Sequence, residues 1–105
     1  MRRSVLLAYA TVAACAMFVS STAHAISICL DPGHGGSDPG AVGCGLKEAE
    51  VVLKSSKMLK TMLESAGHTV YMTRTSNVDV GLGARASYAN GKGVATFASI
   101  HNNSF

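Results

Sequence analysis

The hydrophobic residues of this chain recur in runs and stripes that predict alternating strands and helices. Three short apolar runs, at residues 26–30, 68–73 and 94–100, are rich in β-forming residues and predict buried strands. Between them, residues 46–66 and 82–90 have the spacing of helices, and each is followed by a glycine. The alternating order predicts an α/β fold with a mainly parallel sheet and helices on its faces.

The longer predicted helix has one apolar stripe, and a carboxylate lies within that stripe. At about 100° per residue, the apolar positions within about 80° of Val52 are Leu59, Met62, Leu63 and Ala66. Glu48 falls about 40° from Val52, whereas Glu50 falls about 160° away, toward solvent. A carboxylate on a buried face is costly unless it has a partner, so Glu48 is a candidate site residue.

Two histidines follow the ends of predicted strands. His34 lies in the glycine-rich segment 31–45, which we expect to form a loop, and His101 directly follows the last strand. The carboxyl ends of parallel strands share one edge of a sheet, where sites form. Together with Glu48 these residues make a His₂Glu set, typical of a catalytic zinc that keeps a position open for water. Singly, each also fits a structural role, and the same set suits other divalent ions.

The remaining candidates divide between structural and functional roles. Arg74 follows the second strand, where it can bind a substrate carboxylate, face solvent or pair with Asp79. Arg85 lies in the middle of a helix and is expected to be structural, and His68 begins a strand at the opposite edge. Residues 33–36 lack the Gly-Lys-Ser/Thr ending of a phosphate-binding loop, so no nucleotide site is expected.

The N-terminal segment has the features of a signal peptide. Residues 1–25 contain two arginines, then an apolar run, then Ala-His-Ala, which predicts export to the periplasm or the cell exterior with cleavage after Ala25. The alternative is a lipid anchor at Cys15, because Val-Ala-Ala-Cys resembles a lipoprotein cleavage box. The mature chain has no second apolar segment long enough to cross a membrane.

The charge of the chain argues against one class of partner, and its cysteines leave two interpretations open. The formal net charge is +3, but two of the nine Lys and Arg residues belong to the leader, which contains no acid. The mature chain is therefore nearly neutral and has no Trp, which argues against a nucleic-acid partner. In an oxidising compartment Cys29 and Cys44 can form a disulfide, or Cys29 can be a small buried hydrophobe; both interpretations stay open.

The ordered motifs resemble the opening of zinc-dependent N-acetylmuramoyl-L-alanine amidases. They are LDPGHGG at 30–36, DPGA at 38–41, GLKE at 45–48, TR at 73–74 and SIHNN at 99–103. The resemblance implies that His34, Glu48 and His101 bind Zn²⁺. It also implies hydrolysis, by zinc-activated water, of the amide between N-acetylmuramic acid and the L-alanine of the stem peptide in peptidoglycan.

One part of the family pattern has no counterpart in the sequence. Family members continue well beyond the second histidine, and the glutamate expected as general base or acid would lie beyond Phe105. Residues 26–105 are therefore expected to be the N-terminal part, about half, of an amidase catalytic domain. The alternative is a truncated, catalytically inactive remnant that binds zinc or cell wall. The sequence identifies no activator protein.

Overall fold

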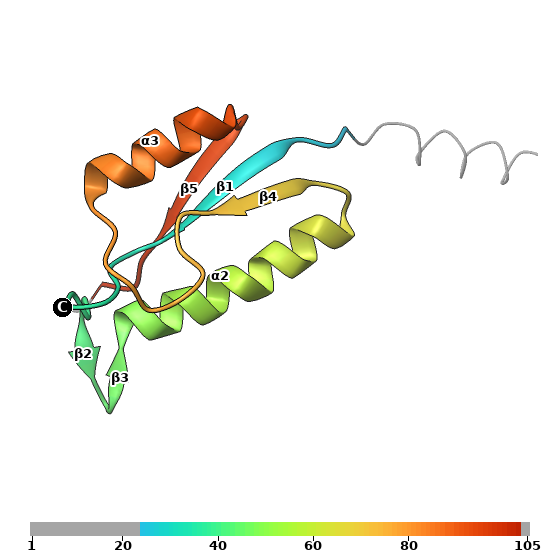
Figure 1. The fold of residues 1–105 in the computed structure, drawn as a ribbon. Helices are drawn as coiled ribbons and strands as arrows, with labels where there is room; N and C mark the ends of the chain where they lie inside the picture. Colours follow the sequence, from blue (N-terminus) through green and yellow to red (C-terminus); the bar gives the residue numbers. More distant parts are fainter. Residues whose placement is uncertain (1–23, 104–105) are drawn as a thin grey trace, which may run out of the picture.

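The computed structural model describes residues 24–103, and its centre is a three-stranded parallel sheet. The central strand β1 (Ser27–Pro32) pairs with β4 (Thr69–Met72) on one side and with β5 (Thr96–Ile100) on the other. The helix α2 (Glu48–Ser65) lies on one face of this sheet and α3 (Leu82–Lys92) on the other (Figure 1). The predicted α/β class, with a parallel sheet between helices, is confirmed.

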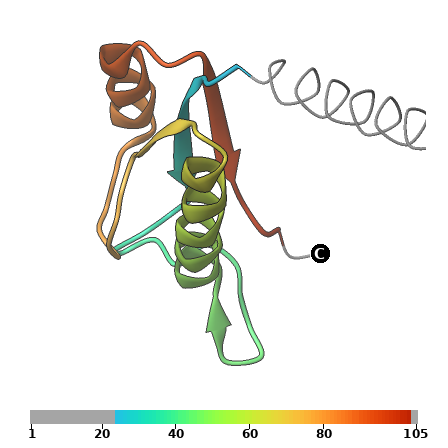
Figure 2. The ribbon, with the colours of Figure 1, turned by 90° about the vertical axis from the view of Figure 1, so that its right-hand side faces the viewer.

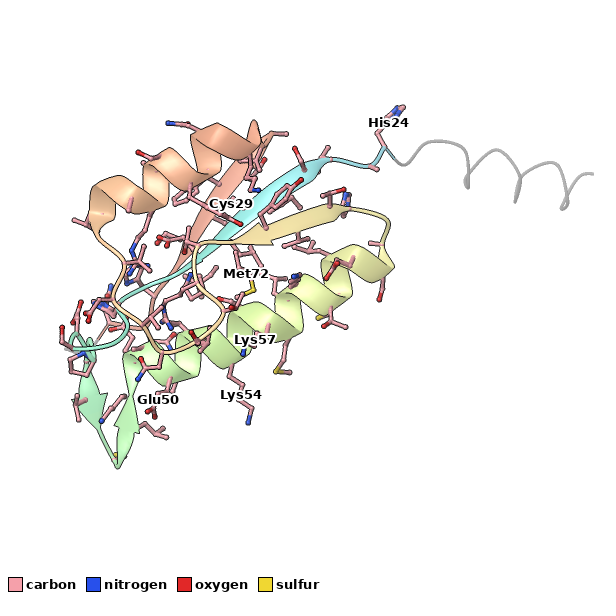
Figure 3. The ribbon with its side chains drawn as sticks, in the orientation of Figure 1. His24, Cys29, Glu50, Lys54, Lys57 and Met72 are labelled. Atoms are coloured by element: carbon pink, nitrogen blue, oxygen red, sulfur yellow. The ribbon has the colours of Figure 1, made fainter. Side chains whose placement is uncertain are left out.

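The two faces of the sheet differ in character because side chains alternate along each strand. Ile28 and Leu30 of β1 and Val70 and Met72 of β4 form the buried apolar cluster, packed against α2. Figure 3 shows Met72 between β4 and α2, while Glu50 on the outer side of α2 points away from the sheet. Cys29 and Tyr71, which lie between the cluster residues of β1 and β4, are on the other face, where Lys92 of α3 lies over the Tyr71 ring.

The apolar stripe of α2 is only partly as predicted. Val52 is fully buried, and Leu59 and Leu63 pack against the core. Met62, however, is 68% exposed, and Ala66 is exposed just beyond the end of the helix, so the assignment of these two residues to the stripe is wrong. The fully buried residues of α2 are Glu48, Ala49, Val52 and Ser56, all in the first half of the helix, while Leu59 and Leu63 continue the contact with the sheet as partly buried side chains.

The segment predicted as a plain loop contains a small hairpin. Strands β2 (Val42–Gly43) and β3 (Leu46–Lys47) are antiparallel, and α2 therefore begins at Glu48, two residues later than predicted. The connecting residues Cys44 (φ 51°) and Gly45 (φ 74°) both have left-handed backbone, as the tight two-residue hairpin turn requires. Figure 2 shows this hairpin extending beyond the first turn of α2.

The two cysteines in the described part of the chain are not joined. Cys29 is buried in β1, whereas Cys44 is exposed at the tip of the hairpin. Of the two interpretations left open by the sequence, the structure supports Cys29 as a small buried hydrophobe. Within residues 24–103, no helix has the length and apolar character needed to span a membrane. The predicted cleavage motif extends into the described residues only at His24 and Ala25, and Cys15 lies outside them.

Candidate metal centre

His34 is held in a tight turn just beyond the end of β1. Its backbone is left-handed (φ 59°), which is uncommon for a residue other than glycine. Two contacts support this conformation: Arg85 Nη2 donates to the His34 carbonyl at 2.8 Å, and His34 Nδ1 lies 2.8 Å from Asp38 Oδ2. The imidazole and the backbone of His34 are thus both fixed.

Glu48 is the first residue of α2, and its carboxylate is buried. It accepts hydrogen bonds from the Ala41 N–H at 3.0 Å and the Asn102 N–H at 2.8 Å. Burial raises the pKa of Glu48, but these backbone hydrogen bonds and the neighbouring histidines outweigh it, so the net pKa is lowered. The carboxylate therefore stays ionised although its side chain is only 3% exposed.

His101 follows β5 and completes a group of three. Its Nδ1 lies 3.2 Å from Glu48 Oε2 and 3.3 Å from His34 Nε2, and His34 Nε2 lies 3.2 Å from the same Glu48 oxygen. Glu48 is almost fully covered, while the side chains of His34 and His101 are 25% and 40% exposed. The structure thus brings together all three residues singled out in the sequence, with the imidazoles on the open side.

The hydrogen bonds around His34 show that this arrangement suits a cation. The pKa of Asp38 is lowered by hydrogen bonds from His34 and from the Gly40 N–H, so Asp38 is a carboxylate and can only accept. His34 must then carry its proton on Nδ1, which leaves a lone pair on Nε2 facing the ionised Glu48 oxygen 3.2 Å away. Two acceptors at this distance repel unless a proton or metal ion lies between them.

Two glycines make room for the group. A Cβ on Gly33 would overlap the His101 ring. A Cβ on Gly40 would lie 2.6 Å from His34 Cδ2 and 2.8 Å from Glu48 Oε1, and Gly40 also has a left-handed backbone (φ 67°). These glycines allow the loop to approach the three side chains closely.

Arg74, which the sequence suggested as a substrate ligand, has a different set of contacts. It is 3% exposed, and its guanidinium donates to four backbone carbonyls at 2.7–3.1 Å. These carbonyls belong to Pro32, Gly33, Ala49 and Ser76. In this arrangement Arg74 ties the His34 loop to the first turn of α2 and does not face the site.

The sequence did not identify the buried ion pair beneath the site. Arg85 Nη1 lies 2.8 Å from Asp31 Oδ1, and the two side chains are 6% and 5% exposed. Arg85 was expected to be structural, but neither its burial nor its partner was foreseen. The available clue was that Asp31 directly follows an apolar strand. Asp79, the partner proposed for Arg74, instead accepts hydrogen bonds from the backbone and hydroxyl of Ser37.

His68 lies away from the group, as predicted. Its Nδ1 accepts a hydrogen bond from the Ile26 N–H at 3.1 Å, which joins the starts of β4 and β1 at the opposite end of the sheet. A cavity of about 400 Å³ borders the two site histidines on the side of α3. A second, of about 230 Å³, lies between Glu48 and the hairpin. The group is therefore reachable from two sides.

Comparisons with known proteins agree with the resemblance seen in the motifs. Residues 28–105 match the Amidase_3 family model, described as N-acetylmuramoyl-L-alanine amidase. The chain is 44% identical over 79 residues to the amidase AmiC of Neisseria meningitidis serogroup B, covering 74% of this chain and 19% of that protein. It is 46% identical over 81 residues to the sporulation-specific amidase of Bacillus subtilis, covering 75% of this chain and 32% of that protein.

Solved structures give the same picture. The amidase AmiC2 of Nostoc punctiforme superposes with a TM-score of 0.73 at 38% identity, covering 76% of this chain and 45% of that one. The catalytic domain of the amidase CwlV from Paenibacillus polymyxa has a TM-score of 0.72 at 29% identity, covering 76% of this chain and 46% of that one. The chain thus spans less than half the length of these structures and a third or less of the two relatives above.

Proposed function

Because this chain belongs to the N-acetylmuramoyl-L-alanine amidase family, we propose that it takes part in hydrolysing the amide between N-acetylmuramic acid and the L-alanine of the stem peptide in peptidoglycan. His34, Glu48 and His101 would hold the Zn²⁺ needed for that reaction. The observation that carries the proposal is the convergence of two imidazole nitrogens and one carboxylate oxygen, separated by 3.2–3.3 Å.

These separations fit a tetrahedral zinc. Ligand atoms at about 2.0–2.2 Å from such an ion lie about 3.3–3.6 Å from one another, close to the observed values. Three protein ligands leave a fourth position for water or substrate, and the exposed imidazoles put that position on the open side. Zinc bound there would polarise the scissile carbonyl and lower the pKa of a water toward about 7.

The chain's own residues supply the geometry around that position. Glu48 holds its ionised carboxylate against the first turn of α2 through two backbone N–H groups. Asp38 keeps the proton of His34 on Nδ1, away from the group. The open side next to His34 and His101 can admit a bulky polymer such as peptidoglycan without a deep cavity.

A second candidate function is binding of zinc or cell wall without turnover. Hydrolysis of an amide needs a proton donor or acceptor, typically worth about 10²–10⁴-fold in rate. Within residues 24–103, the acids closest to the group are already engaged: Asp31 pairs with Arg85, and Asp38 is bonded to His34 and Gly40. Neither of these two carboxylates is free for that step.

The cellular location follows from the substrate. We propose that the protein acts outside the cytoplasm, in the periplasm or at the cell exterior, after cleavage of a leader at residues 1–25. Attachment to a membrane through a lipid on Cys15 is the alternative. Mass spectrometry of the secreted protein distinguishes them, because cleavage after Ala25 and lipidation of Cys15 give different N-termini.

The metal site is tested by zinc content and the reaction by assay on purified sacculi. We expect one zinc per chain in the wild type, loss of that zinc in Glu48→Gln, and retention in the control Glu50→Gln, whose side chain faces solvent. Loss in the control with retention in Glu48→Gln would contradict the proposed ligand set. Release of stem peptides from sacculi would favour hydrolysis; sedimentation with sacculi without release would favour binding alone.

A further inference from the structure

His101 has a second ring nitrogen, Nε2, whose hydrogen-bond partner is not one of the proposed metal ligands. His101 Nε2 lies 3.1 Å from Ser99 Oγ, and the Ser99 hydroxyl lies 2.7 Å from Asp31 Oδ2. Asp31 and Ser99 are partners in the register of the neighbouring strands β1 and β5. A continuous chain of hydrogen bonds therefore runs from an exposed imidazole to a buried carboxylate.

The buried end of this chain is held firmly. Asp31 Oδ1 accepts hydrogen bonds from the Thr73 hydroxyl at 2.7 Å and from Arg85 Nη1 at 2.8 Å. Burial raises the pKa of Asp31, but the hydrogen bonds from Thr73, Arg85 and Ser99 outweigh burial and lower it. Asp31 is therefore ionised and can act only as an acceptor.

The direction of each hydrogen bond follows from that charge. The Ser99 hydroxyl has one proton, and it must donate that proton to Asp31 because Asp31 has none to give. The lone pairs of Ser99 Oγ then accept from His101, so His101 carries its proton on Nε2. In the neutral imidazole this leaves the lone pair on Nδ1, the atom that faces Glu48 and His34.

We propose that Asp31, acting through Ser99, is a positioning residue that fixes the tautomer and orientation of His101 so that Nδ1 is presented to the metal. This inference rests on the proposed function in taking His101 as a metal ligand. Groups that orient metal-bound histidines typically change metal affinity by about 10–100-fold when removed. The role matters here because His101 is the most exposed of the three side chains, at 40%.

The test uses Ser99→Ala in the full chain, with two companion variants. Ser99→Thr keeps the hydroxyl, and Thr96→Ala removes a hydroxyl from another exposed position of β5. Since Ser99 is itself exposed, none of these changes disturbs the apolar core. Zinc affinity is measured by competition with a chromogenic chelator, and the His101 ring nitrogens are observed by ¹⁵N NMR in the metal-free protein at one neutral pH.

We expect Ser99→Ala to bind zinc about 10–100-fold more weakly, with Ser99→Thr and Thr96→Ala close to wild type. In the metal-free wild type the proton of His101 should be on Nε2, and in Ser99→Ala it should be shared between both nitrogens. Unchanged affinity and tautomer in Ser99→Ala, or an equal loss in Ser99→Thr, would overturn the inference. If the wild type binds no zinc, the proposed function fails, while the metal-free spectra still decide whether Ser99 fixes the tautomer.

Discussion

The buried ion pair of Arg85 and Asp31 allows a direct test of how much this pair contributes to the stability of the fold and of the His34 turn. Arg85 donates to Asp31 Oδ1 and also to the carbonyls of Pro32, His34 and Val80, at 2.7–3.0 Å. Replacing Arg85 by Met keeps the apolar length of the side chain but removes all four contacts. The carboxylate of Asp31 is then left buried without its positive partner.

The expected cost is large relative to the stability of so small a fold. Breaking a buried ion pair by removing one partner typically costs about 3–5 kcal/mol. Folded domains are stable by about 0.05–0.15 kcal/mol per residue, which gives about 4–12 kcal/mol for the roughly 80 described residues. Arg85→Met should therefore remove a large share of the free energy of unfolding, and it should release the His34 turn.

Urea unfolding followed by far-UV circular dichroism measures this cost. The control is Lys54→Met, an equally apolar change at an exposed position on the outer side of α2 (Figure 3), which should shift stability by less than about 0.5 kcal/mol. Adding Asp31→Asn to Arg85→Met removes the stranded charge, so the double variant should lose less than the two single losses added together. Strict additivity, or an Arg85→Met protein as stable as the control, would refute the reasoning.

Three further predictions address the loop, the acid response and the thiols. Gly40→Ala should weaken zinc binding in the chelator assay, because its Cβ would overlap two of the three site side chains, whereas Gly91→Ala, with open space around it, should not. The folded-state pKa of Asp31 lies below its ordinary value of 3.8. The ionised carboxylate therefore contributes its full stabilisation above pH 3.8 and loses it as the pH falls through the folded-state pKa. Urea unfolding should show a steeper loss of stability on acidification below about pH 4 in the wild type than in Asp31→Asn. Alkylation followed by peptide mass spectrometry should find Cys44 labelled well before Cys29, since Cys44 is exposed and burial raises the pKa of the Cys29 thiol; equal rates would contradict the burial of Cys29.

The features predicted well from the sequence are those set by regular periodicity. The three apolar runs became the three parallel strands, and the helical phase placed Glu48 inward and Glu50 outward. His34 and His101 could be expected at the same edge because parallel strands end together. For each of these, a local pattern and one topological rule were sufficient.

The features that were missed depend on contacts between distant segments or on an unusual turn. The hairpin turn is Cys-Gly, which lacks the Asn-Gly or Asp-Gly pair that normally reveals such a turn, and its strands are only two residues long. Met62 is exposed although Leu59 and Leu63 pack against the core, because Met62 lies at the edge of the predicted stripe, on the opposite side of Val52 from the packed Leu53. Periodicity describes which side of a helix is apolar, but it does not show where the partner surface ends around the helix.

Arg74 and Arg85 show why the residues that position a site are harder to predict than the proposed metal ligands. A ligand set is recognised by residue types in combination: His34, Glu48 and His101 each fit a structural role singly, but their shared placement makes a His₂Glu set. Arginine has many uses: the sequence left Arg74 open between substrate binding, solvent exposure and a pair with Asp79, and it predicted a structural role for Arg85 without identifying a partner. Their actual partners are mostly backbone carbonyls, which every residue possesses, so no sequence motif identifies the contact. The turn that carries His34 is therefore specified by side chains 40 and 51 positions further along the chain, and substitutions there should alter metal binding without touching a ligand.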